Sequence, residues 1–147
     1  MTTDTPPDTA LTDPRLPLIL DSYQRLTGKI LLADTQSMWH APFAIVAHNT
    51  ASDPVFFYGN KLALQQFEMS FEEFVKLPSR LSAEPLAQEA RAKLLHKVSL
   101  QGYIDDYCGM RISGKNTRFM IRNATVWNLI DEAGLCHGQA ATFITHK

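Results

Sequence analysis

Apolar residues near the start of the chain recur with the spacing of a helix. Intervals of three or four residues separate Ile19, Tyr23, Leu26 and Ile30. Asp13 before Pro14, or a proline at position 17, suits the first turn of such a helix. We predict an amphipathic helix and linker over residues 14–36. The apolar face of this helix must pack against the rest of the chain or against a partner.

Two short runs of β-forming residues come next, and turn-forming residues separate them. The runs are Pro42–His48 and Val55–Tyr58. The six residues between them, 49–54, include Asn, Ser, Asp and Pro, which favour turns. This pattern predicts a β-hairpin.

Two short helices are predicted after the hairpin. Asn60 is a favourable N-cap for the first of them. Ser70 and Glu73 have the spacing of a capping box, which predicts the start of the second. Pro78 ends the second helix, because proline lacks the backbone donor that a helix interior needs.

A longer helix is predicted over residues 83–101, and Gly102 ends it. The residues that we expect on its buried face are Leu86, Ala90, Leu94 and either Leu95 or Val98. The residues that we expect in solvent are Arg91, Lys93 and Lys97.

The hydrophobic period then changes to two, which predicts strands over residues 103–113, 117–130 and 135–145. One side of the middle strand carries Phe119, Ile121, Thr125, Trp127 and Leu129. The other side carries Met120, Ala124, Val126 and Ile130. Both sides are largely apolar, so we expect both faces of the sheet to be covered, one of them by the N-terminal helix or a partner subunit.

These elements together predict an α+β fold. Its five strands form one antiparallel sheet with helices on one face, because a separate two-stranded hairpin would be marginally stable. The amphipathic N-terminal helix precedes the sheet. We predict a disordered tail over residues 1–13, the helix and linker over 14–36, and the domain itself over 37–147.

Composition narrows the class of protein. The chain has 147 residues and a net charge of −1, which fits one globular domain and argues against a general nucleic-acid binder. No signal peptide and no apolar run long enough to cross a membrane is visible, so we expect no membrane partner and a cytoplasmic location. Cys108 and Cys136 match no disulfide framework or metal motif, and we expect Cys108 to be a small buried residue.

Several stretches resemble the MEKHLA domain family, a PAS-like domain. They are VAHNTASDPVFFYGN, ALQQFEMSFEEFVKLPSR, GYIDDYCGMRIS, RFMIRNATVWNLID and GQAATF. The resemblance covers nearly all of the chain after the tail, and it is closest to the stand-alone bacterial or algal type. It implies a PAS-like fold with a sensory or regulatory role. It names no ligand, so the cofactor stays unknown at this point.

Nine polar or amphipathic residues are candidates for ligand binding in the cleft between the sheet and the helices. They are His48, Asn49, Tyr58, Asn60, Arg80, Arg122, Trp127, Asn128 and Gln139. Each also has a structural interpretation, such as helix capping for Asn60 and turn formation for Asn49. Arg80 suits either a bidentate grip on a carboxylate or phosphate or a bond to helix-end carbonyls.

The sequence predicts no catalytic residue and no metal site. Asp105 and Asp106 are adjacent on a strand, so their side chains point to opposite faces unless a bulge intervenes, and we favour ion pairs with neighbouring arginines. The histidines have no zinc-site spacing, although His48 or His96 alone could bind a haem iron. The cysteine motif of flavin-binding light sensors is missing.

Three functions remain open from the sequence. The first is a sensory domain that binds a small molecule, forms a homodimer or acts on a separate output protein. The second is a ligand-free interaction module. The third is a small α+β enzyme like the ketosteroid isomerases, which would require a buried carboxylate such as Asp105 or Asp106.

Overall fold

The computed structural model describes residues 5–144, except for the side chains of Pro85 and Leu86. Its helical elements are α1 Thr9–Thr12, α2 Leu16–Thr27, η1 Thr35–Ser37, α3 Lys61–Phe67, α4 Phe71–Phe74, η2 Ser79–Ser82 and α5 Pro85–Gln101. Its strands are β1 Ala44–His48, β2 Phe56–Gly59, β3 Tyr103–Ile112, β4 Arg118–Ile130 and β5 Cys136–Ile144.

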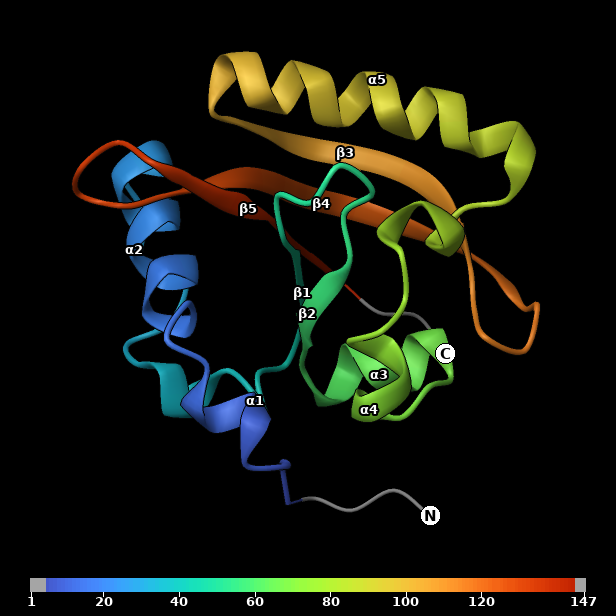
Figure 1. Ribbon diagram of the computed structural model, residues 1–147, viewed down its shortest axis with the longest axis horizontal. Helices are drawn as coiled ribbons and strands as arrows, with labels where there is room; N and C mark the ends of the chain where they lie inside the picture. The colour runs from blue at the N-terminus through green and yellow to red at the C-terminus, as the bar shows by residue number, and fades with distance from the viewer. Residues whose placement is uncertain (1–4, 145–147) are drawn as a thin grey trace.

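The five strands form one antiparallel sheet in the order β2-β1-β5-β4-β3 (Figure 1). The C-terminal strand β5 therefore lies in the middle, between β1 and β4, and joins the first hairpin to the last one. This arrangement confirms the predicted fold class and the predicted five-stranded sheet.

The predicted helix starts are correct, because the capping side chains form the hydrogen bonds that their spacing in the sequence predicts. The Asn60 side chain accepts a hydrogen bond from the Ala63 N–H, and Ser70 and Glu73 form the reciprocal capping box at the start of α4. Gly102 ends α5 with a φ of 95°, a conformation that residues with a side chain rarely adopt.

Helices cover both faces of the sheet. The Trp127 Nε1 donates a hydrogen bond to the Ile19 carbonyl of α2, at 3.1 Å, whereas the next residue, Asn128, donates to the Val98 carbonyl of α5, also at 3.1 Å. Neighbouring strand residues point to opposite faces, so α2 and α5 lie on opposite sides of β4. Figure 1 shows α5 running along β3 and β4, away from α2. The predicted N-terminal helix thus covers the second face within the same chain.

The α2 helix is tied to the end of β4. The Ser22 hydroxyl donates to the Ile130 carbonyl at 3.0 Å and accepts from the Ile130 N–H at 2.9 Å. Ser22 is fully buried, so these two bonds satisfy polar groups that have no access to water.

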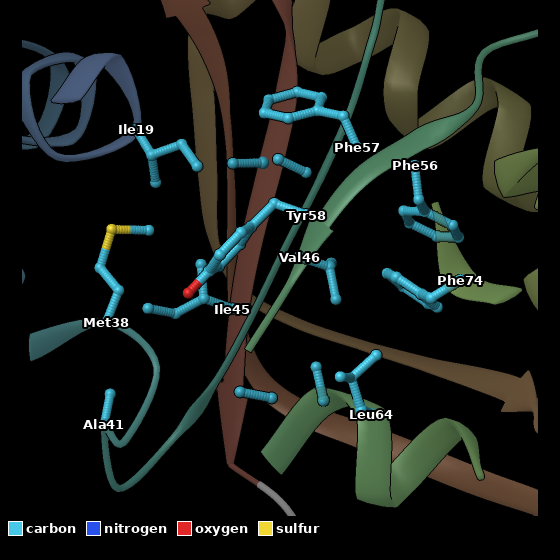
Figure 2. Close-up of a cluster of buried hydrophobic side chains, with 14 of the residues drawn as sticks. Ile19, Met38, Ala41, Ile45, Val46, Phe56, Phe57, Tyr58, Leu64 and Phe74 are labelled. Carbon is cyan, nitrogen blue, oxygen red and sulfur yellow. The ribbon is translucent and has the colours of Figure 1, made fainter. Parts of the chain in front are cut away.

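Aromatic and aliphatic side chains fill the core around β1 and β2. The Phe56 and Phe74 rings stack with centroids 4.2 Å apart. Figure 2 shows this pair on one side of β2, with Tyr58 pointing away from it toward Ile45 and Met38.

A bulge in β4 reverses part of the predicted alternation. Asn123 has a φ of 51°, and the pairing register of β4 with β5 shifts between Arg122 and Thr125. As a result Ile121 and Val126 face the same side, although we predicted opposite sides. Trp127, which we placed on the side of Ile121, lies on the other.

Three further expectations differ from the structure. The N-terminal helix ends at Thr27, where Gly28 adopts a φ of 76°, and Ile30 is 69% exposed rather than buried. In the segment predicted as a disordered tail, residues 9–12 form α1, and Ala10 is buried; residues 1–4 lie outside the described residues. Cys108 is exposed, not buried.

The buried face of α5 was predicted correctly for Leu94, Leu95 and Val98 and incorrectly for two other residues, and the side chain of the predicted Leu86 lies outside the described residues. Ala90 is exposed, whereas Arg91, predicted to lie in solvent, is only 8% exposed. Arg91, Leu94, Leu95 and Val98 follow the spacing of one helix face, and this face points to the sheet.

Candidate functional site

A cavity of about 50 Å³ lies between the sheet and α5. Most of its wall is apolar, from Val46, Ala47, Phe56, Phe67, Leu94, Leu95, Ile121, Val126, Ala140, Ala141 and Phe143. The polar part of the wall comes from His48, Ser82, Arg91, Arg111 and Gln139. A buried water needs about 10 to 15 Å³ of such space, so the cavity has room for a few small-molecule atoms.

Two arginines of the wall are buried without a carboxylate partner. Arg91 on α5 and Arg111 on β3 are each 8% exposed. Within residues 5–144, the Arg91 guanidinium forms no hydrogen bond or ion pair. Arg111 donates to the Met110 carbonyl at 2.8 Å and to the Tyr107 hydroxyl at 3.4 Å. Both guanidiniums are therefore positive charges in an apolar cavity.

The pKa of Arg91 reflects its burial and the nearby positive charge of Arg111. Burial lowers the pKa of Arg91 to about 10, and the charge of Arg111 acts in the same direction. Burial disfavours the charged form of a base, and a neighbouring like charge adds to this. The Arg91 guanidinium nevertheless stays protonated at neutral pH.

His48 offers an unused acceptor. Its Nδ1 lies 3.0 Å from the Asn49 carbonyl, which can only accept, so Nδ1 carries the ring proton and Nε2 keeps a free lone pair. Nε2 is buried and has no hydrogen-bond partner within the described part of the chain. Burial lowers the pKa of His48 to about 4, and the nearby Arg91 charge also lowers it. The imidazole is thus neutral at physiological pH.

The backbone of His48 is held by a close approach of β5. A side chain on Gly138, which has a φ of 139°, would collide with the His48 carbonyl oxygen. Only glycine has no Cβ, so the sequence at this position allows β5 to approach β1 and fixes His48 at the cavity wall.

Polar side chains of the sheet attach the C-terminal half of α5. Asn128 donates to the Val98 carbonyl, and Gln139 donates to the Leu95 carbonyl at 3.0 Å and to the Asn128 Oδ1 at 3.0 Å. At the other end of α5, the Glu84 carboxylate pairs with Arg118 on β4 at the protein surface.

The structure brings three of the nine sequence-predicted candidates to this region. His48 and Gln139 line the cavity, and Asn128 lies beside Gln139 in the register of β4 with β5. The Asn128 amide donates to α5, and the Gln139 amide donates to α5 and to Asn128. Within residues 5–144, His48 is thus the candidate whose binding group, Nε2, has no hydrogen-bond partner.

Two other candidates lie elsewhere in the protein interior. Tyr58 is buried in the core around β2, and burial raises the pKa of its hydroxyl. Trp127 lies under α2, on the opposite face of the sheet from the cavity.

The last four candidates have structural partners or lie in solvent. Asn60 is fully buried, and its side chain bonds Ile45, Ala63 and two carbonyls. The Asn49 side chain accepts two backbone N–H bonds in the β1–β2 turn. Arg80 pairs with Asp53 at 3.1 Å in solvent, and Arg122 is exposed.

Sequence reasoning missed Arg91, Arg111 and Ser82 as site residues. The signal for Arg91 was its place on the same helix face as Leu94 and Val98. Arg111 was considered only as an ion-pair partner of Asp105 or Asp106, but those two carboxylates are exposed and no ion pair joins them to Arg111 within the described residues.

Residues 5–144 contain no cluster of three or more His, Cys, Asp or Glu side chains that could hold a metal ion. Among the same residues, no helix combines the length and the apolar character needed to span a bilayer.

Comparisons with solved structures identify the fold. The PAS domain of a protein from Colwellia psychrerythraea gives a TM-score of 0.63 at 15% identity, over 76% of this chain and 92% of that chain. A light-oxygen-voltage domain studied with a flavin analogue gives 0.64 at 12% identity, over 77% and 84%. The light-state dimer of the fungal blue-light photoreceptor Vivid gives 0.58 at 13% identity, over 71% and 78%. At these identities the likeness concerns the fold alone.

The sequence comparisons are more specific. No curated protein matches the chain. A family model described as MEKHLA domain matches residues 15–147, which include α2, the sheet and the cavity wall. The chain therefore has a PAS-like fold and belongs to the MEKHLA domain family.

Proposed function

We propose that this MEKHLA domain is a sensory or regulatory domain that binds a small molecule in the cavity beneath α5. The observation that carries the proposal is the buried, unused binding capacity of the cavity wall. Within the part of the chain that the structure describes, neither His48 Nε2 nor the Arg91 guanidinium has a hydrogen-bond partner. Buried polar groups are usually satisfied, so a wall with two unsatisfied ones is suited to a ligand that supplies the missing bonds.

Signalling in this proposal is a population shift of α5 or of the protein's self-association. A ligand shifts an equilibrium only by its differential affinity for two states, and a ligand held by Arg91 bonds directly to the helix that would move. The Vivid photoreceptor has been solved as a light-state dimer. By analogy we propose that ligand state is read out through a homodimer or through a separate output protein.

Flavin or haem chemistry fits the site less well than a small metabolite. The cavity is small, about 50 Å³, and neither Cys108 nor Cys136 lines it. Both cysteines are exposed and unpaired, which fits a reducing compartment, and we propose the cytoplasm. The exposed Asp105 and Asp106 offer no buried acid or base, so we propose no enzymatic activity.

The test is native mass spectrometry of the freshly purified protein, with the same sample examined by heteronuclear NMR after ligand extraction. We expect an additional bound mass of a few non-hydrogen atoms, and shifts of the Ala47, Gln139 and Ala140 amides on extraction. The variant Ala141→Leu fills the cavity wall and should abolish the bound mass. Ala133→Leu, in the exposed β4–β5 turn, is the matched control and should retain it.

One observation favours the ligand-free interaction module instead, namely the small volume of the cavity. If the bare protein mass is found, and the amide shifts of the cavity wall are the same before and after ligand extraction, the sensory proposal is refuted and this second function replaces it.

A further inference from the structure

Among the described residues, the cavity wall carries two cations and no anion. Arg91 comes from α5 and Arg111 from β3, and both are more than nine-tenths buried. The charge of Arg111 is close enough to Arg91 to disfavour its protonated form. No carboxylate of the described residues forms an ion pair with either arginine.

Such an arrangement is unfavourable in the free protein. A buried charge normally has a hydrogen-bonded counter-ion, because an unpaired one loses its hydration without compensation. Two like charges at one cavity increase this cost. An anion bound between them would supply the missing counter-charge, so the wall is complementary to an anion that the described residues do not supply.

The remaining wall restricts the kind of anion. It is lined by aliphatic and aromatic side chains, including Leu94, Ile121 and Phe143. A group that fits must therefore combine one compact negative head with an apolar body of few atoms. The guanidinium fork matches a planar carboxylate through two parallel hydrogen bonds.

We infer that the ligand of this cavity is a small monocarboxylate, held by Arg91 and Arg111 through its carboxylate and by the apolar wall through its hydrocarbon part. The inference rests on the proposed function, since it names the ligand class of the same cavity. The free His48 Nε2 accepts a hydrogen bond from a hydroxyl of the ligand or from a water that bridges to it.

The test compares propionate, its neutral isostere propionamide and inorganic phosphate as probes in NMR titrations of the full chain. We expect propionate to shift the amides of the cavity wall in a saturable way and propionamide to bind at least about tenfold more weakly. Arg91→Met and Arg91→Lys should each weaken propionate binding by about tenfold or more, the first by removing the charge and the second by removing the fork. Arg80→Met, which removes an exposed arginine outside the cavity, should leave it unchanged.

The outcomes separate the two proposals. If propionamide binds as tightly as propionate, or phosphate binds with the same Arg91 dependence while propionate does not, the monocarboxylate assignment is overturned and the sensory function stands. If none of the probes binds the wild-type protein, the assignment is likewise overturned. The bound mass and the Ala141→Leu variant then decide the proposed function on their own.

Discussion

Replacing Arg91 by methionine should stabilise the free protein, although it removes a proposed ligand-binding group. Arg91 is 8% exposed, and its guanidinium has no partner among the described residues, so burying this charge destabilises the free protein. Methionine keeps an unbranched stem of similar length that can still pack against the apolar wall.

The magnitude follows from the pKa of Arg91. Burial lowers it from its ordinary value to about 10, and a tenfold change in a protonation equilibrium is about 1.4 kcal/mol. The charged form is therefore disfavoured in the folded state by about 3 kcal/mol relative to the unfolded chain. Because the pKa is depressed, this penalty is fully present at every pH below about 10. We expect Arg91→Met to raise the free energy of unfolding by about 1 to 3 kcal/mol at pH 7.

Urea unfolding followed by tryptophan fluorescence measures this change, because Trp127 is fully buried under α2. Arg122→Met, at an exposed position of β4, is the matched control and should change stability by less than about 0.5 kcal/mol. If Arg91→Met instead lowers stability by 1 kcal/mol or more at an unchanged m-value, the guanidinium is compensated in the free protein, and the reasoning is refuted.

Three further predictions concern His48, Asn60 and α2. Because burial lowers the pKa of His48 to about 4, stability should fall as pH drops below the ordinary histidine pKa. The loss between pH 7 and 5 should be about 2 kcal/mol, and an equal loss in His48→Gln would contradict this. Asn60→Ala removes four buried hydrogen bonds and should cost about 3 to 5 kcal/mol in chemical denaturation, against about 1 kcal/mol for the exposed cap variant Ser70→Ala. Deleting residues 1–28 uncovers Trp127 and should red-shift its fluorescence and lower solubility; an unchanged spectrum would refute the covering role of α2.

The parts of the fold that sequence predicted well are those set by near neighbours in the chain. The caps at Asn60 and Ser70 and the stop at Gly102 depend on residues within one helical turn. The face assignment along β4 failed because Asn123 adopts a positive φ, and nothing in the alternation of apolar residues marks where a strand bulges.

The candidate site was harder to predict than the fold. His48 was identified from its place at the end of a strand, and the structure places it at the cavity wall. Arg91 was assigned to solvent because charged residues are rarely buried without a partner. That rule holds for most structural positions, and it fails where the partner is a molecule outside the chain, as we propose for this cavity.

The uneven attachment of α5 has a kinetic consequence. Asn128 and Gln139 fasten its C-terminal half to the sheet through buried hydrogen bonds, whereas at the other end, among the described residues, the ion pair that links it to the sheet is the surface pair of Glu84 and Arg118. One end of α5 is thus held by hydrogen bonds in the protein interior, and the other end is held by an ion pair in water. Salt weakens the exposed ion pair by screening its charges, whereas it leaves the buried hydrogen bonds almost unchanged. Entry into the cavity should therefore become faster with ionic strength, even as the final complex of an anion becomes weaker.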